Sequence, residues 1–95
     1  MQDELQDDLS RRRKIQYRAW HRGMREMDIL FGRFFDARGA LLAAADLDDL
    51  EILMEELDRD LFMWLTGEVT VPHKFDTPVY RQICAFHTHL KPINV

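Results

Sequence analysis

The sequence predicts an all-α fold, a compact five-helix bundle-like single domain, and three observations support this. Apolar residues recur at helical spacing through most of the 95-residue chain, while no segment alternates apolar and polar residues over a strand's length. Residues that start and end helices separate these segments by short loops. A chain of this length with 46% hydrophobic residues can bury one core but not two.

The first segment is strongly charged. Residues 1–9 are mostly polar and acidic, so we expect a disordered acidic tail there. Ser10 can cap a first helix that runs to about Arg22. Four consecutive cations would then occupy its first turn and oppose the helix dipole, which suggests that the cations serve another purpose.

Two stripes of side chains follow this first helix. Tyr17 and Trp20 form an aromatic stripe, and Ile15 and Ala19 form an aliphatic one on the other side. Both stripes cannot face one small core, so we expect the aromatic stripe to be partly exposed and to resemble a protein-protein hot spot. The alternative is that Tyr17 and Trp20 cover the rim of the core.

The remaining helices are predicted from periodicity and caps. We expect a central core helix over 24–37, a third helix from an Asp46 cap to Leu57, and a short fourth helix from Asp58 or Asp60 to Thr66-Gly67. A fifth helix begins at Thr77-Pro78 and extends to Leu90. The single helical domain is thus expected over 10–91, with 92–95 as a C-terminal tail.

Charge is unevenly distributed along the chain. Residues 11–25 carry cations and no acid, whereas residues 46–60 carry acids and one arginine, so the molecule should be dipolar with a solvated acidic face. An arginine-rich helix with interleaved aromatic residues also permits RNA binding as an alternative function. The overall pI of about 5.5 and the acidic third helix argue against nucleic acid as the partner.

Motifs for catalysis and metal binding are missing. The sequence has no glycine-rich phosphate loop, Cys-x-x-Cys pair or nucleophile elbow, so no catalytic residue and no enzymatic activity are predicted. Glu26 and Asp28 fall on different sides of a helix and cannot act as a carboxylate pair. His87 and His89 diverge by about 200° on a helix, so no metal site is expected. Cys84 suits a small buried hydrophobic residue.

Targeting features are also missing. No run approaches the roughly 18 apolar residues that span a bilayer, so no direct membrane insertion is expected. The acidic start differs from a secretory signal or a mitochondrial presequence, and we therefore predict a cytoplasmic protein.

One junction stands out as a candidate site. Gly23 lies where the arginine-rich segment ends and the apolar-periodic one begins, and a glycine there can break the helix. Arg22 would close one helix and Glu26 would lie in the first turn of the next, where each charge suits the helix dipole. Two interpretations stay open: a structural corner with an Arg22–Glu26 ion pair, or a presented recognition surface.

The run from Arg12 to Asp28 resembles the motif of the succinate dehydrogenase assembly factors that promote covalent FAD attachment. It contains an Arg-Gly-x-x-Glu pattern as Arg22, Gly23 and Glu26. A second pattern of that family is similar to residues 58–67, Asp-Arg-Asp-Leu-Phe-Met-Trp-Leu-Thr-Gly.

The resemblance implies a bacterial assembly factor or chaperone with a five-helix fold and no enzymatic activity. It implies no stably bound cofactor and an action on the FAD attachment of a partner. That partner is the flavoprotein subunit of succinate dehydrogenase, with that of fumarate reductase as a second candidate. The partner-binding residues expected on this basis are Tyr17, Arg18, Trp20, Arg22, Gly23, Met24, Arg25, Glu26 and Asp28.

Overall fold

The protein is seen here in a computed structural model that describes residues 2–88. The described chain forms five α-helices and no strand, which confirms the all-α prediction. The helices are α1 (Gln2–Trp20), α2 (Arg25–Arg38), α3 (Ala44–Leu53), α4 (Asp58–Leu65) and α5 (Pro78–Thr88), with short 3₁₀ helices η1 (Gly39–Leu41) and η2 (His73–Phe75). The predictions for 89–91 and for the 92–95 tail lie outside the described residues.

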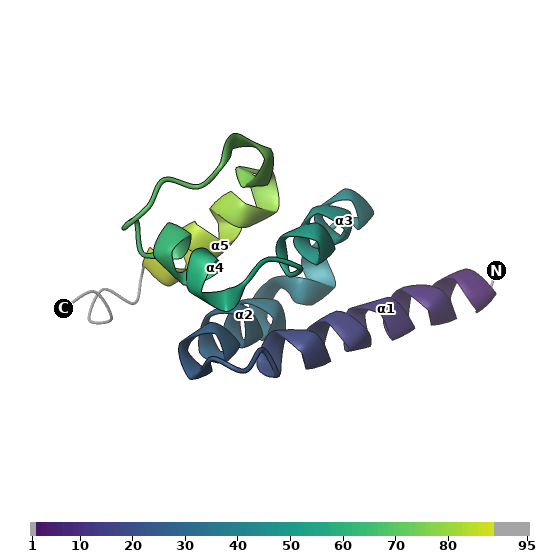
Figure 1. Ribbon diagram of the computed structural model, residues 1–95. Coiled ribbons are helices and arrows are strands. Elements are labelled where there is room, and N and C mark those ends of the chain that lie inside the picture. The colour runs from purple at the N-terminus through teal and green to yellow at the C-terminus, as the bar shows by residue number, and fades with distance from the viewer. Residues whose placement is uncertain (1, 89–95) are drawn as a thin grey trace.

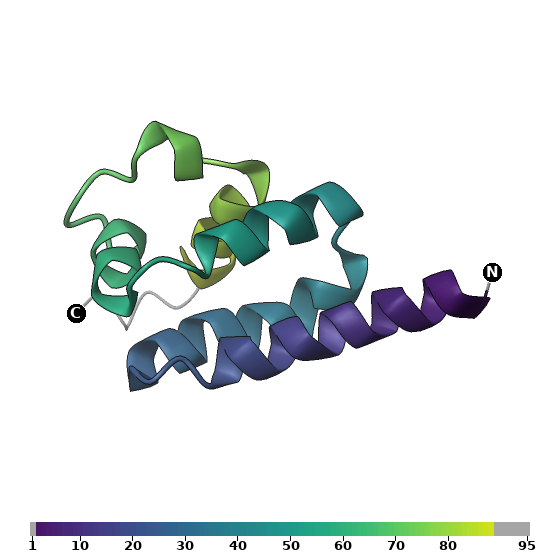
Figure 2. The same ribbon diagram turned by 45° about the vertical axis from the view of Figure 1, so that its right-hand side comes forward.

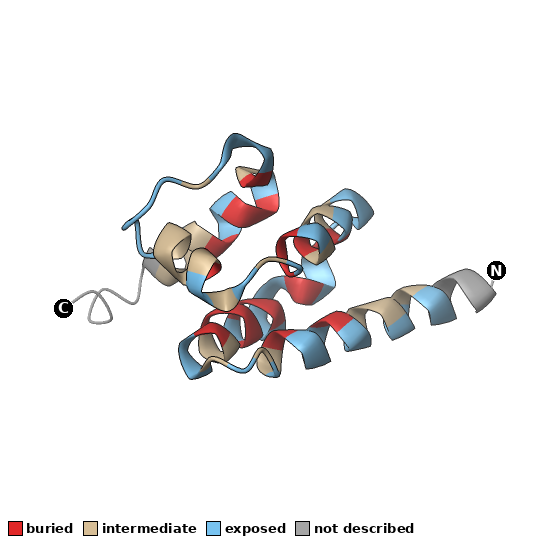
Figure 3. Cartoon of the chain, in the orientation of Figure 1, coloured by how far each residue is buried: buried red, intermediate tan, exposed pale blue. Residues whose placement is uncertain are grey.

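The helices form two parts that share one core. Helices α1 and α2 run antiparallel side by side, and α3, α4 and α5 lie over the same side of this hairpin (Figure 1; Figure 2). The N-terminal part of α1 projects beyond the other helices, and Figure 3 shows it largely exposed. The two ends of α1 therefore differ: its last turns are packed, whereas residues 6, 7, 9 and 10 are exposed.

Helix α2 is the centre of the core, as its phenylalanine pattern predicted. It contacts α1, α4, α5 and η1, and its side chains Met27, Phe31 and Phe34 are almost fully buried. Ile15 and Ala19 of α1 are also buried, which confirms that the aliphatic stripe of α1 faces inward.

The predicted start of α1 is wrong. The helix begins at Gln2, not at Ser10, so residues 2–9 are not a disordered tail. Asp8 accepts a hydrogen bond from Arg12 one turn later at 2.8 Å, and the other guanidinium nitrogens of Arg12 donate to the carbonyls of Gly39 and Leu42. The early start places the cations in mid-helix, which removes the predicted conflict with the helix dipole.

The bounds of α3 also differ from the prediction. The residue before the helix is Ala43, and Asp46 lies in the first turn instead of capping it. The helix ends at Leu53, so Leu57 is not part of its apolar stripe and is 63% exposed. The predicted start of α5 is confirmed, since the Thr77 hydroxyl accepts a hydrogen bond from the Tyr80 amide.

Phe34→Ala should destabilise the fold by about 3–5 kcal/mol, because it removes a core ring that is only 1% exposed and leaves a cavity. Arg13→Ala, an exposed site without an ion pair in the described chain, should stay within about 0.5 kcal/mol of the parent protein. Urea unfolding curves measure both. A larger loss from Arg13→Ala than from Phe34→Ala would contradict this packing.

His87 ties α5 to α2. Its Nε2 donates to the Leu30 carbonyl at 2.6 Å, while its Nδ1 is buried with no hydrogen-bond partner among the described residues. Burial, aided by the nearby charge of Arg33, lowers the pKa of His87 below its usual range, against the opposing effect of the Leu30 hydrogen bond. The neutral ring is therefore the form that suits the fold.

The melting temperature should fall as the pH is lowered from about 7 to about 5.5, because the unfolded chain binds the His87 proton more readily than the folded chain. The stability contributed by neutral His87 is complete above its unfolded pKa and is lost as the pH falls toward its lowered folded pKa. His87→Gln should flatten this part of the profile. Equal slopes for the two proteins would show that another group titrates.

Candidate functional site

The loop between α1 and α2, residues 21–24, is termed the Gly23 loop. Gly23 has φ +103°, and a Cβ placed there would meet no heavy atom within 4 Å, so only backbone strain selects glycine. The Arg22 amide donates to Asp28 Oδ1 at 2.5 Å, and the Asp28 amide donates to the Met24 carbonyl at 3.0 Å. Asp28 thus holds the loop against the first turn of α2 and faces inward.

Arg22 points into the protein from this loop. Its guanidinium donates to Asp58 Oδ1 at 2.6 Å and to the carbonyls of Met54 and Glu56 at 2.6 and 2.9 Å. It also lies over the Phe31 ring, 5.4 Å from its centroid. The Arg22 side chain is 9% exposed and that of Asp58 is 17% exposed, so this is a largely desolvated pair.

The interpretation of this junction as a corner with an Arg22–Glu26 ion pair is therefore wrong, because Arg22 makes its ion pair with Asp58 instead. Glu26 is exposed in the first turn of α2, as the sequence predicted, and so is Arg25. Within the described chain, neither Arg25 nor Glu26 has an ion pair. The Arg-Gly-x-x-Glu pattern thus divides into an inward arginine and an outward glutamate.

The Gly23 loop adjoins the corner between α3 and α4. Met24 is half-buried and, with Arg22, lines an open groove whose other side is formed by this corner, including Leu57 and Arg59. Sequence reasoning did not assign Leu57, Asp58 or Arg59 to the site. The second family pattern, which begins at Asp58, was the available signal.

The aromatic stripe of α1 is divided by the structure. Trp20 is half-buried against Gly32, where a Cβ would come within 2.3 Å of the indole, and its Nε1 donates to the Asp36 carboxylate at 3.2 Å. Tyr17 is 64% exposed and stacks on His21 with ring centroids 4.0 Å apart. Trp20 thus covers the core rim, whereas Tyr17 stands in solvent.

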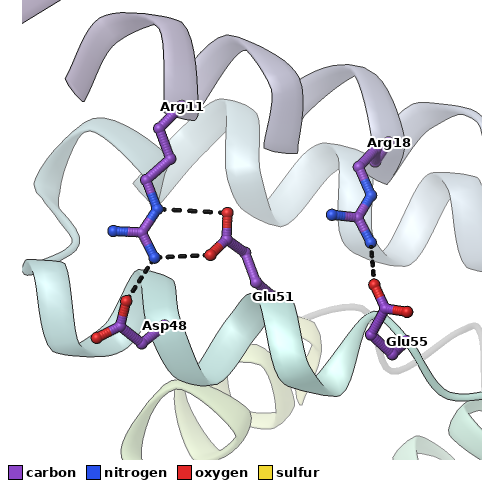
Figure 4. Close-up of polar contacts among 5 residues, drawn as sticks. All are labelled: Arg11, Arg18, Asp48, Glu51 and Glu55. Carbon is purple, nitrogen blue, oxygen red and sulfur yellow. Dashed lines mark hydrogen bonds and ion pairs between the residues drawn. The ribbon is translucent and has the colours of Figure 1, made fainter. Parts of the chain in front are cut away.

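Ion pairs join α1 to two acids of α3 and to Glu55, which follows α3 (Figure 4). Arg11 reaches Asp48 and Glu51, and Arg18 reaches Glu55, at 2.5 to 2.8 Å. The hydrogen bonds from Glu51 and then Asp48 raise the pKa of Arg11. The basic and acidic segments are therefore joined by ion pairs. The side chains of Asp48 and Glu55 are still 65% and 70% exposed, so the acidic face stays largely solvated, as the sequence predicted. The dipolar character of the molecule stays a prediction.

The described residues offer neither a metal site nor a reactive thiol. They contain no cluster of three or more histidine, cysteine, aspartate or glutamate side chains arranged to hold a metal ion. Burial raises the pKa of the Cys84 thiol, although the Tyr80 hydrogen bond opposes this shift. The raised pKa keeps the thiol protonated. None of the described helices combines the length and apolar character needed to cross a membrane.

Arg22→Ala should lower the free energy of unfolding by about 3 kcal/mol or more, since it leaves the Asp58 carboxylate and two backbone carbonyls without their donor. Arg25→Ala should change it by no more than about 0.5 kcal/mol, because Arg25 is exposed and unpaired in the described chain. Denaturant titration of the two arginine variants compares them directly. Equal stability of both would refute the structural role of Arg22.

The fold and the site define a class: a small helical protein that presents exposed charges, Arg25 and Glu26, beside a loop held by internal hydrogen bonds. A family described as "Flavinator of succinate dehydrogenase" matches residues 13–87. The chain belongs to this family.

Individual relatives agree with the family match. The chain is 39% identical over 79 residues to a protein of Acetobacter pasteurianus named FAD assembly factor SdhE, covering 82% of this chain and 72% of the relative. It is 31% identical over 81 residues to the mitochondrial succinate dehydrogenase assembly factor 2 of Dictyostelium discoideum, covering 85% of this chain and 57% of the relative. No solved structure matches.

Proposed function

We propose that this protein is an assembly factor that binds the flavoprotein subunit of succinate dehydrogenase and promotes its covalent attachment of FAD. Family membership and the names of the relatives support a role in the flavinylation of this enzyme. The flavoprotein of fumarate reductase is a second partner of the same kind. A bacterial cytoplasmic location stays a prediction.

The proposed contact surface rests on one observation, which is that the last residues of the Arg-Gly-x-x-Glu pattern are exposed. Arg25 and Glu26 stand in solvent next to Gly23, with no ion pair in the described chain. The backbone beneath them is held by Asp28 and Arg22. Because this backbone is already fixed before binding, the two charged side chains lose less conformational freedom when a partner binds, which favours recognition.

The proposed mechanism requires no catalytic group and no stably bound cofactor in this protein. The protein binds one conformation of the flavoprotein more tightly than the others and so raises the population of that conformation. If this conformation brings the flavin close to its target histidine, the attachment reaction gains from proximity while the flavoprotein supplies the chemistry. The Gly23 loop with Arg25 and Glu26 forms the contact.

Glu26→Ala tests this proposal. Removing one member of a desolvated interfacial charge pair costs about 2 kcal/mol, so binding to the flavoprotein should weaken by about thirtyfold and the yield of covalent flavin should fall. The melting temperature should stay near that of the parent protein, because Glu26 is exposed. In-gel flavin fluorescence of the co-expressed flavoprotein measures the yield.

Glu68→Ala is the matched control, because Glu68 is also exposed and follows α4 instead of the Gly23 loop. It should leave flavin yield and melting temperature unchanged. A normal flavin yield with Glu26→Ala at normal expression would contradict the recognition role assigned to this residue.

A further inference from the structure

One outward face of α1 differs in its charge pairing from the rest of the helix. Arg13 and Lys14 are exposed and have no ion pair among the described residues. The other cations of the helix are each paired with an acid of the same chain, namely Arg11, Arg12 and Arg18. The two unpaired cations are therefore free to attract an external acid.

The same face carries a fixed aromatic pair. Tyr17 and His21 stack with an interplanar angle of 18°, and Nδ1 of His21 donates to the Tyr17 carbonyl at 2.7 Å. Arg13, Lys14 and Tyr17 fall within about 100° of one another around the helix axis, at 3.6 residues per turn, and His21, which follows the end of α1, joins them through its stacking on Tyr17. These four residues are termed the α1 ridge.

The α1 ridge leads directly into the proposed contact surface. His21 is the first residue of the Gly23 loop, and Arg25 and Glu26 follow that loop in the chain. A partner seated on the loop can therefore continue along α1 toward Lys14. Tyrosine and arginine, both present on the ridge, are also enriched at protein interfaces.

We propose that the α1 ridge is a second contact surface for the flavoprotein subunit and takes an acidic segment of it, with Tyr17 packing against an apolar side chain. This inference rests on the proposed function, because the occupant is the same partner. Arg13 and Lys14 attract the acidic groups, which speeds association, and the Tyr17–His21 stack supplies the apolar contact.

Charge distribution favours an acidic protein segment over RNA. The cations of α1 that turn toward α3 are neutralised there by Asp48, Glu51 and Glu55 (Figure 4). A polynucleotide gains affinity by neutralising many phosphates at once and would meet these carboxylates close by. A short acidic segment needs only the two unpaired cations, Arg13 and Lys14.

The test compares Lys14→Glu with Arg33→Glu, two variants that change the net charge equally. Arg33 is exposed on α2, lies near His87 of α5, and has no ion pair in the described chain. At low salt, Lys14→Glu should weaken binding of the purified flavoprotein subunit by about tenfold, and Arg33→Glu by less than about twofold. The difference should shrink at high salt, where charges are screened.

Tyr17→Ala is the second variant. It should weaken binding by about tenfold or more at both salt concentrations, because an apolar contact is not screened. Circular dichroism should show parent-like helix content for all three variants, since each changes an exposed residue.

The outcomes separate the two proposals. Binding that is weakened by Glu26→Ala but unchanged by Lys14→Glu and Tyr17→Ala would overturn the ridge alone, as would equal losses from Lys14→Glu and Arg33→Glu. A parent protein that does not bind the flavoprotein would overturn both proposals. Tight binding of a labelled oligouridylate at physiological salt, abolished by Lys14→Glu while flavoprotein binding is kept, would assign the ridge to RNA.

Discussion

The Arg22 guanidinium joins the parts of this protein on which the candidate site depends. It starts from the loop between α1 and α2, lies over Phe31 of α2, and donates to Asp58 and to two carbonyls of the turn between α3 and α4. The planar fork of arginine satisfies several acceptors at once, which the single ammonium of lysine cannot do with the same geometry. The Gly23 loop and the α3–α4 corner are therefore coupled as one rigid unit.

This coupling explains how the short segment from Arg22 to Asp28 has two different roles. Arg22 and Asp28 face inward and hold the loop, whereas Arg25 and Glu26 face outward without ion pairs in the described chain. Gly23 allows the change of direction through its positive φ. A preorganised support of this kind reduces the entropy lost on binding, so the inward residues aid recognition without touching the partner.

Charge pairing within the protein decides which cations stay available. Three arginines of α1 are paired with acids of α1, of α3 and of the turn that follows α3, and Arg22 is paired with Asp58, although the sequence shows a continuous basic run there. Once α3 packs beside α1, Arg13 and Lys14 differ from the other cations of α1, because they stay exposed and have no ion pair among the described residues. A basic run in a sequence is therefore a poor measure of the basic surface in a folded protein.

The sequence by itself determined the helical class, the central role of α2 and the start of α5 at Thr77-Pro78, because periodicity and capping are local properties. Its two motifs also placed the chain in its family. The tertiary structure decided the partner of Arg22 and the start of α1. Asp58 lies far from Arg22 in the chain, and Arg12 finds the carbonyls of Gly39 and Leu42 only after folding, so these contacts leave no signal in local sequence spacing.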